Sequence, residues 1–149
     1  MSPRPVSFLL PLLAALYTMQ GMSVGLAFDA YPVLLRYAGV SLETLALLPL
    51  ASLPWIVRFL WAPLLDNHWS PRFGRRKSWI LPAQCLQSGL LVVIALLPFN
   101  TTTAPVLMAV IFVSCMVGST QDIATDGLAA DLSHGKTLVN ANAVQVGGL

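Results

Sequence analysis

Residues 104–124, APVLMAVIFVSCMVGSTQDIA, form the stretch that decides the fold, because they are almost continuously apolar and carry one charged side chain, Asp122. A helix needs about 20 predominantly apolar residues to cross the hydrocarbon core of a bilayer. The stretch therefore predicts a transmembrane helix that ends near Ala124. Two further acids, Asp126 and Asp131, follow directly, and acids are scarce in this chain.

Three other apolar runs of similar length precede this helix, over residues 6–28, 42–65 and 79–99. The chain of 149 residues is 56% hydrophobic and 9% charged, whereas soluble domains carry roughly 25% charged residues. Its mean hydropathy is +0.75. The sequence therefore predicts an all-α membrane protein with four transmembrane helices. The second of them contains three prolines and is expected to bend.

A fifth span is expected to begin at about Val139, close to the final residues NANAVQVGGL. This run is much shorter than a complete span. We therefore expect residues 1–149 to be part of a longer membrane protein or a shortened product of one.

Six of the eight basic residues lie on one side of the bilayer if successive spans alternate in direction, and the opposite loops carry only Arg36. The six are Arg4 before the first span, Arg72, Arg75, Arg76 and Lys77 between the second and third, and Lys136 after the fourth. Positively charged loops are typical of the cytoplasmic side of a membrane protein. The pattern therefore predicts a multi-pass protein with a cytoplasmic N-terminus.

Arg58 lies inside the second span, where a lone charge costs on the order of 3 kcal/mol on insertion scales. Helical spacing places it on about the same face as Trp61, so both side chains are expected to point into the bundle. Binding of an anionic group, or pairing with an acid, is favoured over snorkelling to the bilayer surface.

Asp122 and Asp126 are four residues apart, and a helix places both carboxylates on one face. A helix that begins at Ala104 crosses the bilayer in about 20 residues, so both acids are expected at its cytoplasmic mouth. There they would meet the basic loop PRFGRRKSW. A deep substrate or proton site is the alternative for the same two acids.

The stretch DIATDG also resembles part of the motif of membrane phosphatidyltransferases that use CDP-alcohols and bind divalent metals. In this chain the spacing of the first two acids differs, the arginine of that motif is absent, and no later pair of acids follows. A metal of this kind needs several converging oxygen ligands. Cys85 and Cys115 have no CxxC spacing either. We therefore predict no enzyme, catalytic residue, metal or cofactor.

Two motifs together resemble the N-terminal part of a major facilitator superfamily transporter: LWAPLLDNHWSPRFGRRKSWI at 60–80 and QDIATDGLAADL at 121–132. The loop signature of that superfamily has an acid at the end of helix two, then glycine and basic residues. Asp66 and Gly74-Arg75-Arg76-Lys77 correspond to these parts. Seven residues, 67–73, separate Asp66 from Gly74, a longer spacing than is usual in the superfamily.

The longer loop, with FLWAPLLD before it and QDIATDG after it, is similar to one branch: the muropeptide permease AmpG, the acetyl-coenzyme A transporters and the RhtX/FptX-type siderophore importers. The stretch AGVSLETLALLPLASLPWIVRFLWAPLLD resembles the siderophore importers most. This resemblance implies a helical bundle in which residues 1–149 are a partial N-terminal lobe, and a proton-driven permease that needs a C-terminal lobe.

The resemblance also implies residue roles. A cytoplasmic gate latch would join Asp66, Gly74 and Arg75 or Arg76 to Asp122 or Asp126. The substrate cavity would contain Arg58, Trp61 and Gln121.

The resulting functional prediction is proton-coupled import of an iron-siderophore across a bacterial inner membrane. The alternatives are a muropeptide permease and an inactive truncated remnant. The expected partners are a small-molecule substrate (ferric siderophore or muropeptide), the lipid bilayer and the C-terminal lobe. No nucleic-acid partner is expected.

Overall fold

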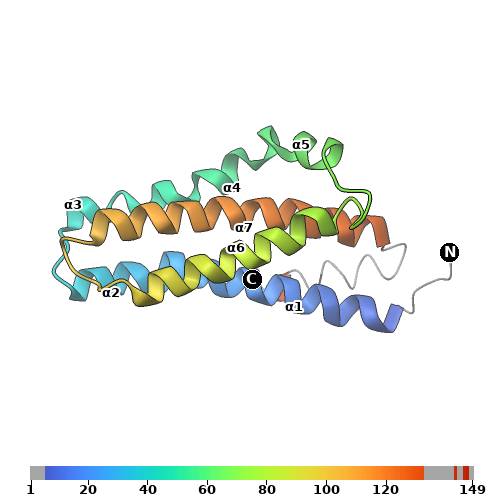
Figure 1. Ribbon diagram of the computed structural model, residues 1–149. Helices are drawn as coiled ribbons and strands as arrows, with labels where there is room; N and C mark the ends of the chain where they lie inside the picture. The colour runs from blue at the N-terminus through green and yellow to red at the C-terminus, as the bar shows by residue number, and fades with distance from the viewer. Residues whose placement is uncertain (1–5, 133–142, 144–145, 148–149) are drawn as a thin grey trace.

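The structure, a computed structural model, describes residues 6–132, 143 and 146–147, with side chains from Leu10 onward. The described residues form helices joined by turns and loops, with no strand among them. Four segments are long and apolar enough to cross a membrane: Leu10–Tyr37, Leu42–Leu60, Lys77–Leu96 and Ala104–Asp131. Figure 1 shows them as an elongated bundle. The predicted all-α membrane fold is therefore confirmed. The start of a fifth span near Val139 lies outside the described residues.

The first segment is one continuous helical path built from α1 (Val6–Gly25), a π-helical turn η1 (Leu26–Ala30) and α2 (Tyr31–Tyr37). It extends nine residues beyond the predicted end at residue 28, from 29 to 37. Pro32 follows directly on the π-helical turn, in which the Tyr31 nitrogen donates to the Leu26 carbonyl oxygen five residues earlier, so the α-helical ladder restarts at the proline and the path continues. The path ends at Gly39, whose φ of +84° few other residues adopt.

The second segment, which was predicted to bend, is broken into short helical pieces. The pieces are α3 (Leu42–Leu45), η2 (Leu48–Ser52), α4 (Leu53–Val57), η3 (Arg58–Leu60) and α5 (Ala62–Asn67). Pro49, Pro54 and Pro63 each lie in the first turn of a piece. Because proline donates no backbone hydrogen bond, the ladder restarts at each one. Arg58 begins one of the restarted turns.

The last two segments are single helices, α6 (Lys77–Leu96) and α7 (Ala104–Leu132). α7 packs against α6, α1 and the pieces of the second segment, so it is the central helix of the bundle. It continues eight residues beyond the predicted end at 124, from 125 to 132. Bilayer thickness sets only the shortest helix that can cross, so a helix continues beyond that length wherever the following residues still favour helix.

The two halves of α7 bury different kinds of side chain. Its first half contributes Leu107 and Ile111, both 0% exposed, to an apolar core shared with η1, α2 and η2. Its second half buries four polar side chains besides small apolar ones: Ser119, Gln121, Asp122 and Thr125. Buried polar groups need hydrogen-bond or charge partners. The second half of α7 is therefore where the candidate site must be sought.

Leu107→Ala should destabilise the bundle by about 2–5 kcal/mol, because it removes a fully buried side chain and leaves a cavity. Val106→Ala is the matched control, since Val106 is 53% exposed on the same helix and its truncation should cost under about 0.5 kcal/mol. Thermal unfolding of the purified full-length protein in detergent measures both. Equal losses of stability would contradict the core position of Leu107.

Candidate functional site

Asp122 forms an ion pair with Arg58, so the charge at the start of η3 is matched by an acid from the central helix. The Asp122 side chain is only 5% exposed, whereas 37% of the Arg58 side chain remains exposed. The sequence predicted that Arg58 either binds an anionic group or pairs with an acid, and in the structure it pairs with an acid. The pair is asymmetric: the carboxylate is buried and the guanidinium is partly open to its surroundings.

Two other side chains hold this pair in place. With its amide oriented to satisfy both groups, Gln20 of α1 donates to Asp122 Oδ1 at 3.3 Å and accepts from the Asp122 backbone nitrogen at 3.1 Å. The Trp55 ring lies under the guanidinium, with 5.9 Å from Arg58 Cζ to the ring centroid. Both carboxylate oxygens of Asp122 therefore have partners, as a buried charge requires.

Asp126 lies one helical turn beyond Asp122 and accepts a hydrogen bond from the Tyr17 hydroxyl at 2.8 Å. Tyr17 is 1% exposed. On α1, Tyr17 and Gln20 are three residues apart, and their partners on α7 are four apart, so both contacts fall along one seam between the two helices. This seam fixes the register of α1 against α7.

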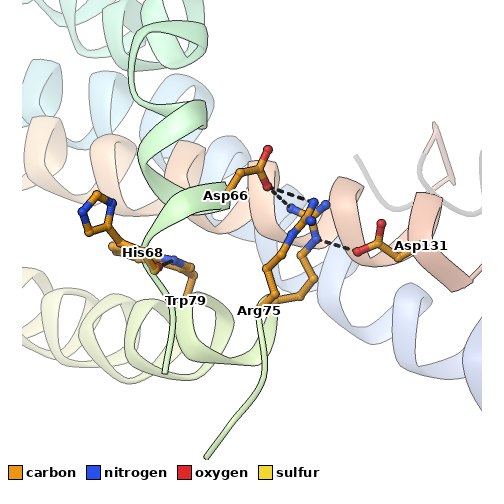
Figure 2. Close-up of polar contacts among 6 residues, drawn as sticks. Asp66, His68, Arg75, Trp79 and Asp131 are labelled. Carbon is orange, nitrogen blue, oxygen red and sulfur yellow. Dashed lines mark hydrogen bonds and ion pairs between the residues drawn. The ribbon is translucent and has the colours of Figure 1, made fainter. Parts of the chain in front are cut away.

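A second ion-pair network lies at the end of the bundle where the basic loop joins α6. Arg76 Nη1 donates to Asp66 Oδ1 at 2.7 Å, and Arg76 Nε donates to Asp131 Oδ2 at 2.8 Å. Arg75 Nη2 lies 3.2 Å from Asp66 Oδ1. Figure 2 shows the two aspartates on either side of the arginines. The network joins the end of α5, the loop and the end of α7.

Arg76 is the best-enclosed member of this network, with 12% of its side chain exposed. Burial alone would lower the pKa of the guanidinium, but the hydrogen bonds and negative charges of Asp131 and Asp66 outweigh it and raise that pKa. The side chain lies directly against Gly127 of α7: a Cβ added at Gly127 would overlap the guanidinium. Absence of a side chain at Gly127 is therefore what admits Arg76.

The predicted latch and this network differ in the acid that α7 contributes: Asp122 or Asp126 was predicted, and Asp131 is observed. Arg76 contacts Asp131, whereas Asp122 pairs with Arg58 and Asp126 binds Tyr17. The physical reason is the length of α7. Nine residues of helix carry Asp131 roughly 13 Å beyond Asp122, to the level at which the loop emerges. Asp66, Arg75 and Arg76 do come together as expected, and Gly74 supplies a turn with a φ of +84° just before them.

Asp131 was the residue that sequence reasoning missed, although a signal for it exists. Residues 125–132 contain no proline, and their strong helix formers continue the helical pattern past the predicted end.

Among the described residues, no group of three or more His, Cys, Asp or Glu side chains could hold a metal ion.

A cavity of about 130 Å³ lies between α1, α4, α6 and α7. Gln121, which is 3% exposed, and Trp55 line it, and Gln87 on its wall donates to the Ser114 hydroxyl at 2.7 Å. The other two side chains that were predicted to line a cavity are not among its lining residues, although Arg58 lies against Trp55, which is. Arg58 is paired with Asp122, and Trp61 packs against the apolar cluster around Leu16, Leu65, Ile80 and Ala124.

The sequence model of a family described as acetyl-coenzyme A transporter 1 matches residues 9–106, which is more than half of the chain. The chain belongs to this family. The four apolar helices of the described residues agree with membership of a family described by a membrane transport protein.

Relatives of the chain come from fungi and bacteria. It is 32% identical over 145 residues to an uncharacterized protein of Schizosaccharomyces pombe, a match that covers 92% of this chain and 27% of that protein. It is 30% identical to an uncharacterized membrane protein of Saccharomyces cerevisiae, over 93% of this chain and 29% of that protein. AmpG 4 of Rickettsia felis, which its name describes as a candidate transporter, is 31% identical over 87% of this chain and 32% of its own length.

The chain therefore spans about a third or less of the length of these relatives. No solved structure matches it. The acetyl-coenzyme A transporter family and the AmpG relative agree with the predicted branch, and neither is a siderophore importer by name.

Gly127→Ala should lower the stability of the full-length protein by about 1–3 kcal/mol, because the new methyl group displaces Arg76 from Asp66 and Asp131. Gly89→Ala is the control: it lies in α6, and an added Cβ there meets nothing within 4 Å. The helix propensity of alanine favours that change by up to about 1 kcal/mol. An unfolding temperature that rises equally in both variants would contradict the packing of Arg76 on Gly127.

Arg58→Met should destabilise by about 3 kcal/mol, because it leaves the Asp122 carboxylate buried without its cation. The double variant Arg58→Met/Asp122→Leu should recover most of that loss, since both charges are removed together. Denaturant or thermal unfolding of the two single variants and the double variant gives the coupling energy. A coupling near zero would show that the ion pair does not form in the folded protein.

Proposed function

We propose that residues 6–132 form the first four helices of the N-terminal lobe of a secondary transporter for an anionic organic solute. The observation that carries this proposal is the Arg58–Asp122 pair inside the apolar part of the bundle. Charged groups within membrane helices are costly and are retained mainly at substrate or ion pathways. Membership of a transporter family supports the same conclusion.

Arg58 is the group proposed to bind the solute. More than a third of its side chain is exposed, so part of its fork of donors is accessible beside Asp122. A guanidinium binds planar carboxylate and phosphate groups through paired hydrogen bonds. Trp55, which lies beneath it and also lines the cavity, would hold the guanidinium in the bound orientation. Gln121 on the cavity wall is proposed to contact a neutral part of the same solute.

Three solutes are candidates for this site. The family description supports acetyl-coenzyme A, which is anionic through its phosphates, and the relative named AmpG supports a muropeptide, which carries carboxylates. Import of a ferric siderophore, predicted from the motifs, rests on the sequence resemblance alone. Arg58 would bind an anionic group of any of them, so the substrate must be decided by an uptake assay.

Proton coupling is proposed to arise from competition for Arg58. An anionic solute that takes hydrogen bonds from the guanidinium weakens its pairing with Asp122. A buried carboxylate that loses its cation favours the neutral form, since burial penalises the charge. Asp122 would then accept a proton as the solute binds. This exchange makes solute and proton bind together, which is the requirement for symport.

The Asp66–Arg76–Asp131 network is proposed as the gate latch of the lobe, with Arg75 as an additional cation and Gly74 as the turn that presents both arginines. Asp131 takes the place that the sequence prediction gave to Asp122 and Asp126. The two aspartates are nearly half exposed. Exposed ion pairs are worth about 0–1 kcal/mol each, so such a latch can open at low energetic cost.

Uptake by the full-length protein in proteoliposomes tests the proposal directly. Labelled acetyl-coenzyme A, an anhydromuropeptide and a ferric siderophore are supplied with and without an imposed pH gradient. Arg58→Gln should reduce uptake of the true substrate at least tenfold, and Asp122→Asn should remove the dependence on the pH gradient. Arg36→Gln is the control, because Arg36 bonds the Val40 carbonyl at the opposite end of the bundle.

Uptake that is unchanged in Arg58→Gln would reject Arg58 as the binding group. If Asp122→Asn keeps its full response to the gradient, the coupling role belongs to another residue. Absence of uptake for all three solutes by a folded wild-type protein would instead favour the inactive alternative.

A further inference from the structure

The loop between α5 and α6, residues 68–76, is held as a fixed structure by the first turns of α6. Trp79 Nε1 donates to the His68 carbonyl oxygen at 2.7 Å, and the Ser78 hydroxyl donates to the Gly74 carbonyl oxygen at 2.8 Å. The Ser70 backbone nitrogen donates back to the Ser78 hydroxyl at 3.1 Å. Figure 2 shows His68 and Trp79 side by side at the base of this loop. Its outer side chains are therefore presented in defined positions.

The cations of this region divide into two groups. Arg75 and Arg76 pair with Asp66, and Arg76 also pairs with Asp131. Arg72, at the tip of the loop, and Lys77, the first residue of α6, are exposed and have no ion-pair partner among the described residues. Within the part of the chain that the structure describes, these two positive charges are therefore unpaired.

Two large apolar side chains accompany these charges on the same loop. Trp69 is 48% exposed and Phe73 is 59% exposed. The loop joins two segments that are each apolar enough to cross a membrane, so it lies at a boundary between membrane and water. Tryptophan is enriched at that depth, where an amphipathic ring contacts both headgroups and acyl chains.

We infer that Arg72, Lys77, Trp69 and Phe73 form a binding surface for an anionic phospholipid of the leaflet next to this loop. Arg72 and Lys77 would bind the phosphate and its neighbouring anionic headgroup. Trp69 and Phe73 would pack against the glycerol and the upper acyl chains. A soluble anion would use the two cations and leave both rings exposed to water, so the pairing of rings with charges favours a lipid.

A consequence of this surface is that the lipid would adjoin the ion-pair network. Arg75, 45% exposed and adjacent in sequence to Arg76, lies 3.2 Å from Asp66. A lipid phosphate held by Arg72 and Lys77 would compete with Asp66 for Arg75. The inference does not depend on the transported solute, because it concerns the binding of lipid to the folded protein.

Lipid titration of the purified full-length protein in neutral detergent, followed by native mass spectrometry, tests the surface. Phosphatidylglycerol should bind more tightly than phosphatidylcholine to the wild-type protein. Arg72→Gln/Lys77→Gln should weaken phosphatidylglycerol binding by about fivefold for each cation removed and leave phosphatidylcholine binding unchanged. Phe73→Ala should weaken the binding of both lipids. Arg36→Gln, a loss of one charge at the opposite end of the bundle, should leave both unchanged.

Two results would overturn the inference. The first is a double variant that binds phosphatidylglycerol as tightly as Arg36→Gln does. The second is displacement of the lipid by soluble glycerophosphoglycerol at an equal concentration, since that would identify the ligand as a free phosphate ester. Because the double variant changes only exposed side chains, its binding of phosphatidylcholine also reports that the protein is folded.

Discussion

A carboxylate buried in a membrane bundle must be paired, and the Asp122 side chain, only 5% exposed, sets this requirement for the protein. Its two oxygens are satisfied by Arg58 from the broken second segment and by Gln20 from α1. The same contacts satisfy the charge of Arg58, which would otherwise be costly within the second span. The position of the second segment and of α1 against α7 follows from this one need for partners.

The acids of α7 act as successive attachment points along its second half. Asp122 and Asp126 hold α1 through Gln20 and Tyr17, while Asp131 holds the loop before α6 through Arg76. The stronger enclosure is at Asp122, and the network at Asp131 is partly exposed. One end of this contact surface is therefore buried and the other is partly exposed, and the exposed end is the one proposed as the gate latch.

Much of this arrangement could be predicted from single features of the sequence. Apolar runs predicted the helices, prolines predicted the broken second segment, and the isolated Arg58 indicated a partner. The ends of the helices could not be predicted this way, because bilayer thickness sets the shortest crossing and not the length of a helix. The identity of Gln20, Tyr17 and Asp131 as partners depends on how helices distant in sequence rotate against one another. That rotation is decided by packing, including the room at Gly127 for Arg76.

The pairing of Arg58 with Asp122 also has a consequence for the order of biosynthesis. A ribosome makes the second segment well before α7, so Arg58 reaches the insertion machinery while its partner has not yet been synthesised. An unpaired arginine at that stage costs on the order of 3 kcal/mol. The second segment therefore reaches its full stability in the membrane only once α7 supplies Asp122. The last of the four helices to be synthesised therefore stabilises one made before it.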